Sequence, residues 1–158
     1  AILGMAAAPE ESCAHMEERA RTLTLLRERL IDGLSQIPHA VLNGDRAHRL
    51  PGNVSFCFEG IEGESLLLLL DDRGIRASSG SACTSGSLDP SHVLLALGRP
   101  HEIAHGSLRL TLSHENTQED VDAVIRAVTE VVAYLRSISP VWRDLTSGKT
   151  EFILKEAV

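Results

Sequence analysis

Two hydrophobic periods alternate along the chain, and this alternation restricts the possible folds more than any other feature. Apolar residues over 13–34 recur every three or four positions among charged ones, which predicts an amphipathic helix that ends near 33–38. Strict alternation follows at Val54, Phe56 and Phe58, which is typical of a strand with one buried face. A chain that mixes the two periods predicts an α/β (α+β) fold with strands and helices around a single sheet.

The rest of the chain continues this intermixing. Leu108, Leu110 and Leu112 alternate with polar residues and predict a strand over 106–113. Thr117 then predicts the N-cap of a helix whose apolar positions run to Leu135. The other predicted elements are a strand over 39–45, a buried helix over 63–74, a strand over 74–78, and a helix over 91–98 that Asp89 caps and Pro90 begins.

Charge and cysteine content exclude several classes of protein. The 158 residues carry a net charge of −7 and no basic run, which argues against a nucleic-acid partner. The leucine run at 66–70 is too short to span a bilayer, so no membrane role is predicted. Three cysteines, at widely separated positions, favour neither a disulfide framework nor a zinc knuckle. We therefore expect a reducing, cytoplasmic location.

Cys83 is the first candidate for chemistry. It lies within SSGSACTSGS, a run of small and polar residues that cannot bury it, between a predicted strand and a predicted helix. A thiol reacts as its thiolate, and its ordinary pKa of about 8.5 falls near a cation or a helix N-terminus. The alternative is an exposed thiol without a role. Cys13 and Cys57 follow helical and strand periods, so packing is their predicted role.

Arg109 is the second candidate, and the segment HEIAH at 101–105 is a third that the context opposes. The neighbours of Arg109 point to one face of the predicted strand, which leaves its guanidinium on the other face, where it could bind a carboxylate at two points. A solvated charge is the alternative. HEIAH matches a zinc-hydrolase pattern. Because Pro100 and Gly106 bracket it too closely for a helix, we predict a connecting loop and no metal site.

Three stretches together resemble a known family. They are RLPGNVSFCFEGIEGESLLLLLDDRGI, SSGSACTSGSLDPSHVLLALG and HGSLRLTLSHENTQEDVD. The sequence is similar to the C-terminal small domain of a cysteine desulfurase of the Isc or Nif type, a pyridoxal-phosphate enzyme of the class V aminotransferase group. The resemblance implies the small domain of a fold-type I enzyme over 1–139, with one mostly antiparallel sheet packed against helices. Residues 140–158 would form a tail that could dock elsewhere.

The same resemblance gives the two candidate residues roles. Cys83 would take the sulfur of L-cysteine as a persulfide, leave L-alanine, and pass the sulfur to an acceptor or scaffold protein, for iron–sulfur cluster assembly or other sulfur trafficking. Arg109 would bind the substrate carboxylate. The complete enzyme would be a homodimer that uses pyridoxal 5'-phosphate.

One departure from the family pattern concerns the cofactor. A pyridoxal-phosphate enzyme needs a lysine in its pocket, but the two lysines here, Lys149 and Lys155, lie in the tail. The resemblance places that lysine in a large domain that precedes this segment. We therefore expect a fragment, or half of a split enzyme, that is inactive alone. The alternative is an independent α/β sulfur-carrier or binding module that uses Cys83 without pyridoxal phosphate.

Overall fold

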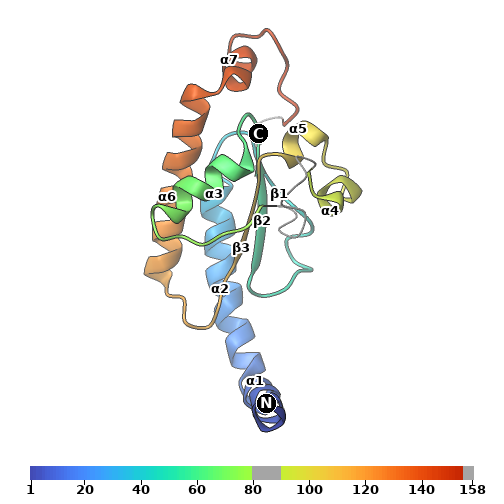
Figure 1. The fold of residues 1–158 in the computed structure, drawn as a ribbon, viewed down its shortest axis with the longest axis vertical. Coiled ribbons are helices and arrows are strands. Elements are labelled where there is room, and N and C mark those ends of the chain that lie inside the picture. Colours follow the sequence, from blue (N-terminus) through green and yellow to red (C-terminus); the bar gives the residue numbers. More distant parts are fainter. Residues whose placement is uncertain (80–89, 155–158) are drawn as a thin grey trace.

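The computed structural model describes residues 1–79 and 90–154 (Figure 1). Helices and strands are intermixed along the chain, as the two hydrophobic periods predict. The elements are α1 (Ile2–Ala14), α2 (Met16–Leu34), β1 (Ala40–Leu42), β2 (Asn53–Phe58), α3 (Gly63–Asp71), α4 (His92–Ala96), α5 (His101–Ala104), β3 (Ser107–Thr111), α6 (Gln118–Ile138) and α7 (Pro140–Thr146).

A three-stranded antiparallel sheet forms the centre of the domain, with the strand order β1-β2-β3. Helices α2, α3 and α6 lie on one side of it, and the short helices α4 and α5 lie on the other (Figure 1). On β2 and β3, Val54 faces Leu110 and Phe56 faces Leu108. All four side chains are buried, which confirms the predicted alternation and the predicted antiparallel sheet against helices.

Helix α6 supplies the other half of the main core. Val121, Val128 and Val132 pack inward at helical spacing. At its N-terminus Thr117 Oγ1 accepts the backbone N–H of Asp120 at 3.2 Å, and Asp120 Oδ2 accepts the backbone N–H of Thr117 at 2.9 Å. This reciprocal cap confirms the predicted start of the helix and satisfies two backbone donors that have no partner inside it.

Three of the elements predicted between residues 63 and 98 differ from the structure. The leucine-rich helix α3 is not buried throughout: Leu66 and Leu70 face the core, but Leu68 is 73% exposed, because only one side of the helix meets the sheet. No strand forms over 74–78, where Ser78 alone pairs with β3. Helix α4 has Ser91 as its N-cap, so the predicted cap at Asp89 is wrong.

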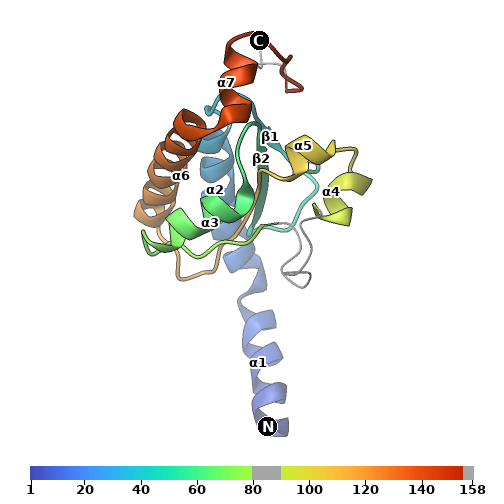
Figure 2. The same ribbon diagram turned by 45° about the horizontal axis from the view of Figure 1, so that its top comes forward.

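The N-terminal apolar period is divided between two helices. Helix α1 contains Pro9, ends before His15 and buries none of its residues, and it projects from the domain (Figure 2). Cys13 in α1 is exposed, so the prediction that packing buries it is wrong. Periodicity indicates which side of a helix is apolar, but every residue of α1 is exposed, so its apolar residues enter no core of the described part of the domain.

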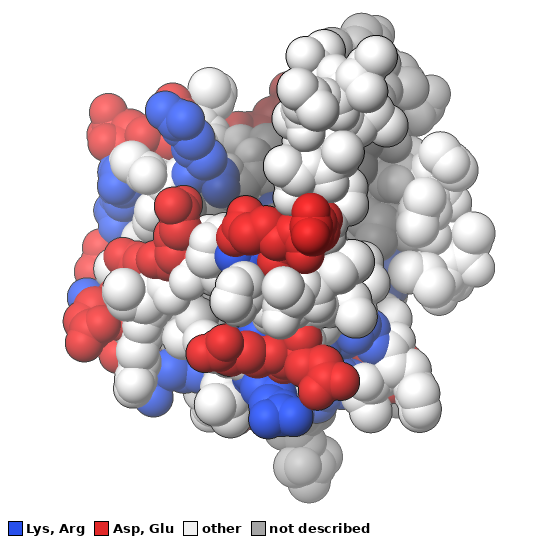
Figure 3. Space-filling model, turned by 90° about the horizontal axis from the view of Figure 1, so that it is seen from below, with Lys and Arg blue, Asp and Glu red and all other residues white. Residues whose placement is uncertain are grey.

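Charged side chains are mixed on one face of the molecule. Seen from the end at which α1 projects, acidic and basic groups lie side by side (Figure 3). Within the described residues, no helix is long and apolar enough to cross a membrane.

Candidate functional site

Arg109 lies in the middle of β3, opposite Ser55 of β2, and its side chain is exposed as the alternation predicts. On its other side it pairs with Ser78. The Ser78 N–H donates to the Arg109 carbonyl at 3.0 Å, and the Arg109 N–H donates to the Ser78 carbonyl at 2.6 Å. Arg109 Nη2 also donates to Ser78 Oγ at 3.3 Å. Arg109 is thus fixed beside the residues that precede the stretch containing Cys83, and Cys83 itself lies outside the described residues.

A pocket of about 570 Å³ opens beside Arg109. One wall comes from α1 and α2, and the other comes from residues 50–53 and the end of β3. Met16, Leu23 and Leu112 make much of the lining apolar, while Arg109 and Arg19 provide guanidinium groups. Arg19 is ion-paired with Glu11, a contact that lowers the pKa of that carboxyl through a hydrogen bond and the guanidinium charge. The pocket could therefore take a small anion with an apolar part.

Arg27 holds one wall of this pocket in place. It is 6% exposed, and its Nη1 donates to the carbonyl oxygens of Arg49 at 3.4 Å and Leu50 at 3.3 Å. Burial by itself would raise the pKa of Glu28, but hydrogen bonds from Arg27 and Arg46 outweigh burial and keep that pKa below its ordinary value. Sequence reasoning missed Arg27. A signal was available, since Arg27 falls on the apolar stripe between Leu23 and Leu30.

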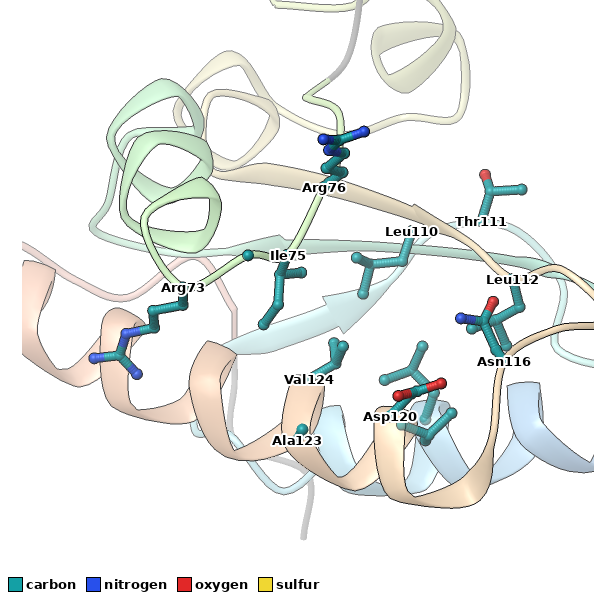
Figure 4. A pocket seen from close by; sticks show the side chains of 13 residues that line it. Arg73, Ile75, Arg76, Leu110, Thr111, Leu112, Asn116, Asp120, Ala123 and Val124 are labelled. Carbon is teal, nitrogen blue, oxygen red and sulfur yellow. The ribbon is translucent and has the colours of Figure 1, made fainter.

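A second pocket, of about 490 Å³, lies between α6, β3 and residues 73–76 (Figure 4). Ile75, Leu110 and Val124 point toward one another, and the Arg73 guanidinium turns away from them (Figure 4). Arg73 pairs with Glu130. The polar lining groups Asp120 and Asn116 serve the cap of α6 and the turn before it. Arg73, Asp120 and Asn116 thus already have partners within the domain. We therefore favour the Arg109 pocket as the functional site.

The segment HEIAH forms a one-turn helix, α5, where a loop was predicted. The helix is possible because Pro100 precedes its first turn as the N-cap, where no backbone N–H is needed. The ring centroids of His101 and His105 are 6.5 Å apart, and His105 Nδ1 lies 3.7 Å from Glu62 Oε2. Among residues 1–79 and 90–154, no three potential ligands gather in a metal-binding group.

The other cysteine and lysine side chains show whether the described residues could hold the cofactor. Cys57 is fully buried, as predicted, and burial raises the pKa of its thiol. Asn43 Nδ2 lies 3.2 Å from its sulfur. Lys149 is exposed and donates to Asp144 Oδ2 at 3.0 Å, and Lys155 lies outside the described residues. The described residues therefore do not by themselves fit a pyridoxal-phosphate site, because none supplies a lysine to a pocket.

Comparison with known proteins shows the family to which this chain belongs. The family model for class-V aminotransferases matches residues 1–124. The chain belongs to the class-V aminotransferase family. Cysteine desulfurase IscS of Methanosarcina thermophila is 58% identical to it over 139 residues, which cover 88% of this chain and 34% of that protein. Cysteine desulfurase NifS of Azotobacter vinelandii is 49% identical over 142 residues, which cover 89% of this chain and 35% of that protein.

Solved structures agree with this class-V assignment. A NifS-like protein superposes with a TM-score of 0.73 and 31% identity, over 85% of this chain and 33% of that chain. A NifS-like protein from Rickettsia africae gives a TM-score of 0.66 and 28% identity, over 76% of this chain and 31% of that one. The chain thus spans about a third of the length of the curated relatives it matches. Its fold is similar to that of about a third of each of these two NifS-like proteins.

Proposed function

We propose that this chain is the part of a cysteine desulfurase that binds the substrate carboxylate and receives its sulfur. The complete protein would convert L-cysteine to L-alanine and pass the sulfur to an acceptor or scaffold protein, for iron–sulfur cluster assembly or other sulfur trafficking. The observation that carries this proposal is the pairing of Arg109 with Ser78. It holds a substrate-binding cation beside the segment that leads to Cys83, in a chain whose relatives are named cysteine desulfurases.

The chemistry assigned to this chain is a sulfur transfer between two thiols. The Cys83 thiolate forms a bond to the sulfur of L-cysteine, the carbon–sulfur bond of the substrate breaks, and a proton replaces sulfur on that carbon. The products are L-alanine and a persulfide on Cys83. Pyridoxal phosphate, when bound, supplies the electron sink that weakens the carbon–sulfur bond. Arg109 holds the carboxylate through two parallel hydrogen bonds, which fixes the direction from which Cys83 approaches.

The setting of this reaction is part of the same proposal. We place it in the cytoplasm and in a homodimer. The cofactor would lie in a large domain of the same enzyme, because Lys149, the one lysine among the described residues, is exposed and ion-paired with Asp144. The competing function is a sulfur-carrier module that needs no pyridoxal phosphate.

Turnover of L-cysteine by the protein expressed from its complete coding sequence tests the proposal. We expect equal amounts of L-alanine and of protein-bound or released sulfur, and we expect both to require pyridoxal phosphate. Sulfur loading of Cys83 from a persulfide donor, without any L-alanine from L-cysteine, would favour the carrier module instead.

Substitution of Arg109 by lysine in that protein should weaken use of L-cysteine. Lysine keeps the charge but loses the planar two-point contact, so kcat/KM should fall by about tenfold to a hundredfold. Arg76, an exposed arginine on the approach to Ser78, provides the matched control, and Arg76→Lys should leave kcat/KM within about twofold. An unchanged kcat/KM for Arg109→Lys would remove Arg109 from the substrate site.

A further inference from the structure

Glu59 is a buried carboxylate just after β2, with 3% of its surface exposed. Its Oε1 accepts the backbone N–H of Ile153 at 2.7 Å, and its Oε2 accepts the backbone N–H of Leu154 at 3.0 Å. Hydrogen bonds to an ionised group are stronger than neutral ones, and burial removes the competition of water. One side chain from the middle of the chain therefore holds the C-terminal segment 151–154 at two adjacent points.

Aromatic contacts also hold the same segment. The Phe152 ring stacks on His39 with centroids 3.8 Å apart and meets Trp142 edge-on at 5.4 Å. His39 Nδ1 lies 2.8 Å from the carbonyl oxygen of Leu154, which can only accept, so Nδ1 carries the proton. Segment 151–154 is thus fixed by His39 and Trp142 as well as by Glu59.

Leu154 then completes a small second core. It packs against a cluster of buried residues that joins β2 to the two short helices: Cys57, Leu94, Ile103 and Ala104. Arg99, between α4 and α5, adds hydrogen bonds to the Leu42 carbonyl at 2.8 Å and to Asn43 Oδ1 at 2.9 Å. Helices of five and four residues have too few internal hydrogen bonds to be stable alone. Their position therefore depends on this cluster and on Arg99.

We propose that residues 151–154 form a strap that braces α4 and α5 against the sheet, and that Glu59 is the positioning residue that fastens it. Helix α4 is the first described element after Cys83 in the sequence. By holding α4 in place, the strap therefore fixes the point at which the stretch containing Cys83 rejoins the described domain. This effect on sulfur transfer rests on the proposed function, whereas the bracing of α4 and α5 does not.

Hydrogen exchange on the full-length protein tests the brace, with two independent ways to unfasten the strap. In Glu59→Gln the negative charge is lost. One of the two backbone N–H groups then faces the amide N–H₂ group, which cannot accept its hydrogen bond. Ile153→Pro removes the N–H that Oε1 accepts, and Ile153→Ala is its matched control because Ile153 is 45% exposed and alanine keeps the N–H. Both unfastening variants should speed exchange in 151–154 and in α4 and α5 by about tenfold or more. Exchange in the first turns of α6, around Val121, should stay unchanged, because Arg136, which interacts with the Glu59 charge, lies near the other end of that helix.

The same variants should make the Cys57 thiol react faster with an alkylating agent, since Leu154 covers the cluster that contains it. Faster exchange in 151–154 with unchanged exchange in α4 and α5 would overturn the brace. A strap loosened equally by Ile153→Ala would also overturn the role of the Glu59 hydrogen bonds.

Sulfur transfer by the same variants tests the second half of the inference. We expect slower persulfide formation on Cys83 with an unchanged KM for L-cysteine, because Arg109 lies outside the braced cluster. If persulfide forms at the normal rate although the brace is loosened, the proposed effect of the strap on sulfur transfer is wrong. Absence of desulfurase activity in the unaltered protein would instead contradict the proposed function, and the exchange result would still decide the brace.

Discussion

Replacement of Cys83 by serine should abolish sulfur transfer from L-cysteine while the complete protein still binds pyridoxal phosphate and L-cysteine. A serine hydroxyl has a far higher pKa than a thiol, and oxygen does not accept sulfur as a stable persulfide analogue. In the proposed function Arg109 binds the substrate, and this change leaves Arg109 intact. We expect the rate of L-alanine formation to fall by about a thousandfold or more.

Cys13→Ser is the matched control for this experiment. Cys13 is exposed in α1, so its loss should change the rate of L-alanine formation by less than about twofold. Persulfide labelling with a thiol-specific reagent, followed by mass spectrometry, should locate the transferred sulfur on Cys83. Turnover by Cys83→Ser close to that of the unaltered protein would contradict the proposed mechanism.

Replacement of Arg136 by leucine should lower the free energy of unfolding by about 2–4 kcal/mol. Arg136 is 7% exposed, and its guanidinium donates to the carbonyl oxygens of Pro38 at 2.8 Å, His39 at 3.2 Å and Glu59 at 3.0 Å. It also lies 3.9 Å from the centroid of the Trp142 ring. Leucine would leave three buried acceptors without this donor, and each such loss costs about 1–3 kcal/mol before relaxation.

Burial lowers the pKa of the Arg136 guanidinium to about 10, so this group stays charged at neutral pH and its hydrogen bonds persist there. Urea unfolding followed by circular dichroism measures the effect. Arg126→Leu, an exposed position on the same helix, is the control and should change the free energy of unfolding by less than about 0.5 kcal/mol. Equal stability of the Arg136 and Arg126 variants would show that the buried hydrogen bonds contribute nothing net.

The sequence predicts the main core well because local pattern and burial agree there. The alternation in β2 and β3 and the helical stripe of α6 each need only one apolar surface, and Thr117 caps its helix through residues three positions away. The polar side of β3 also follows from alternation, which places Arg109 at the surface. These features depend on near neighbours in the chain.

Contacts between distant residues are what sequence reasoning missed. Arg27, Glu59 and Arg136 are charged groups in the interior, and each forms hydrogen bonds with backbone atoms far away in the sequence. A period in hydrophobicity cannot reveal such partners. The exposure of Cys13 was missed for a related reason, since an apolar helix face does not identify what covers it. The positions of Arg27 and Arg136 on apolar stripes, with Arg136 four residues after Val132, could have given a warning.

The pairing of Ser78 with Arg109 also protects the sheet from self-association. β3 is an edge strand, and unpaired backbone groups on an edge can recruit a strand from another molecule. At Arg109 both the N–H and the carbonyl are already paired with Ser78. The opposite edge, β1, has only three residues, and Arg99 occupies the carbonyl of Leu42. The contact that orients Arg109 therefore also blocks the middle of β3 against edge-to-edge aggregation.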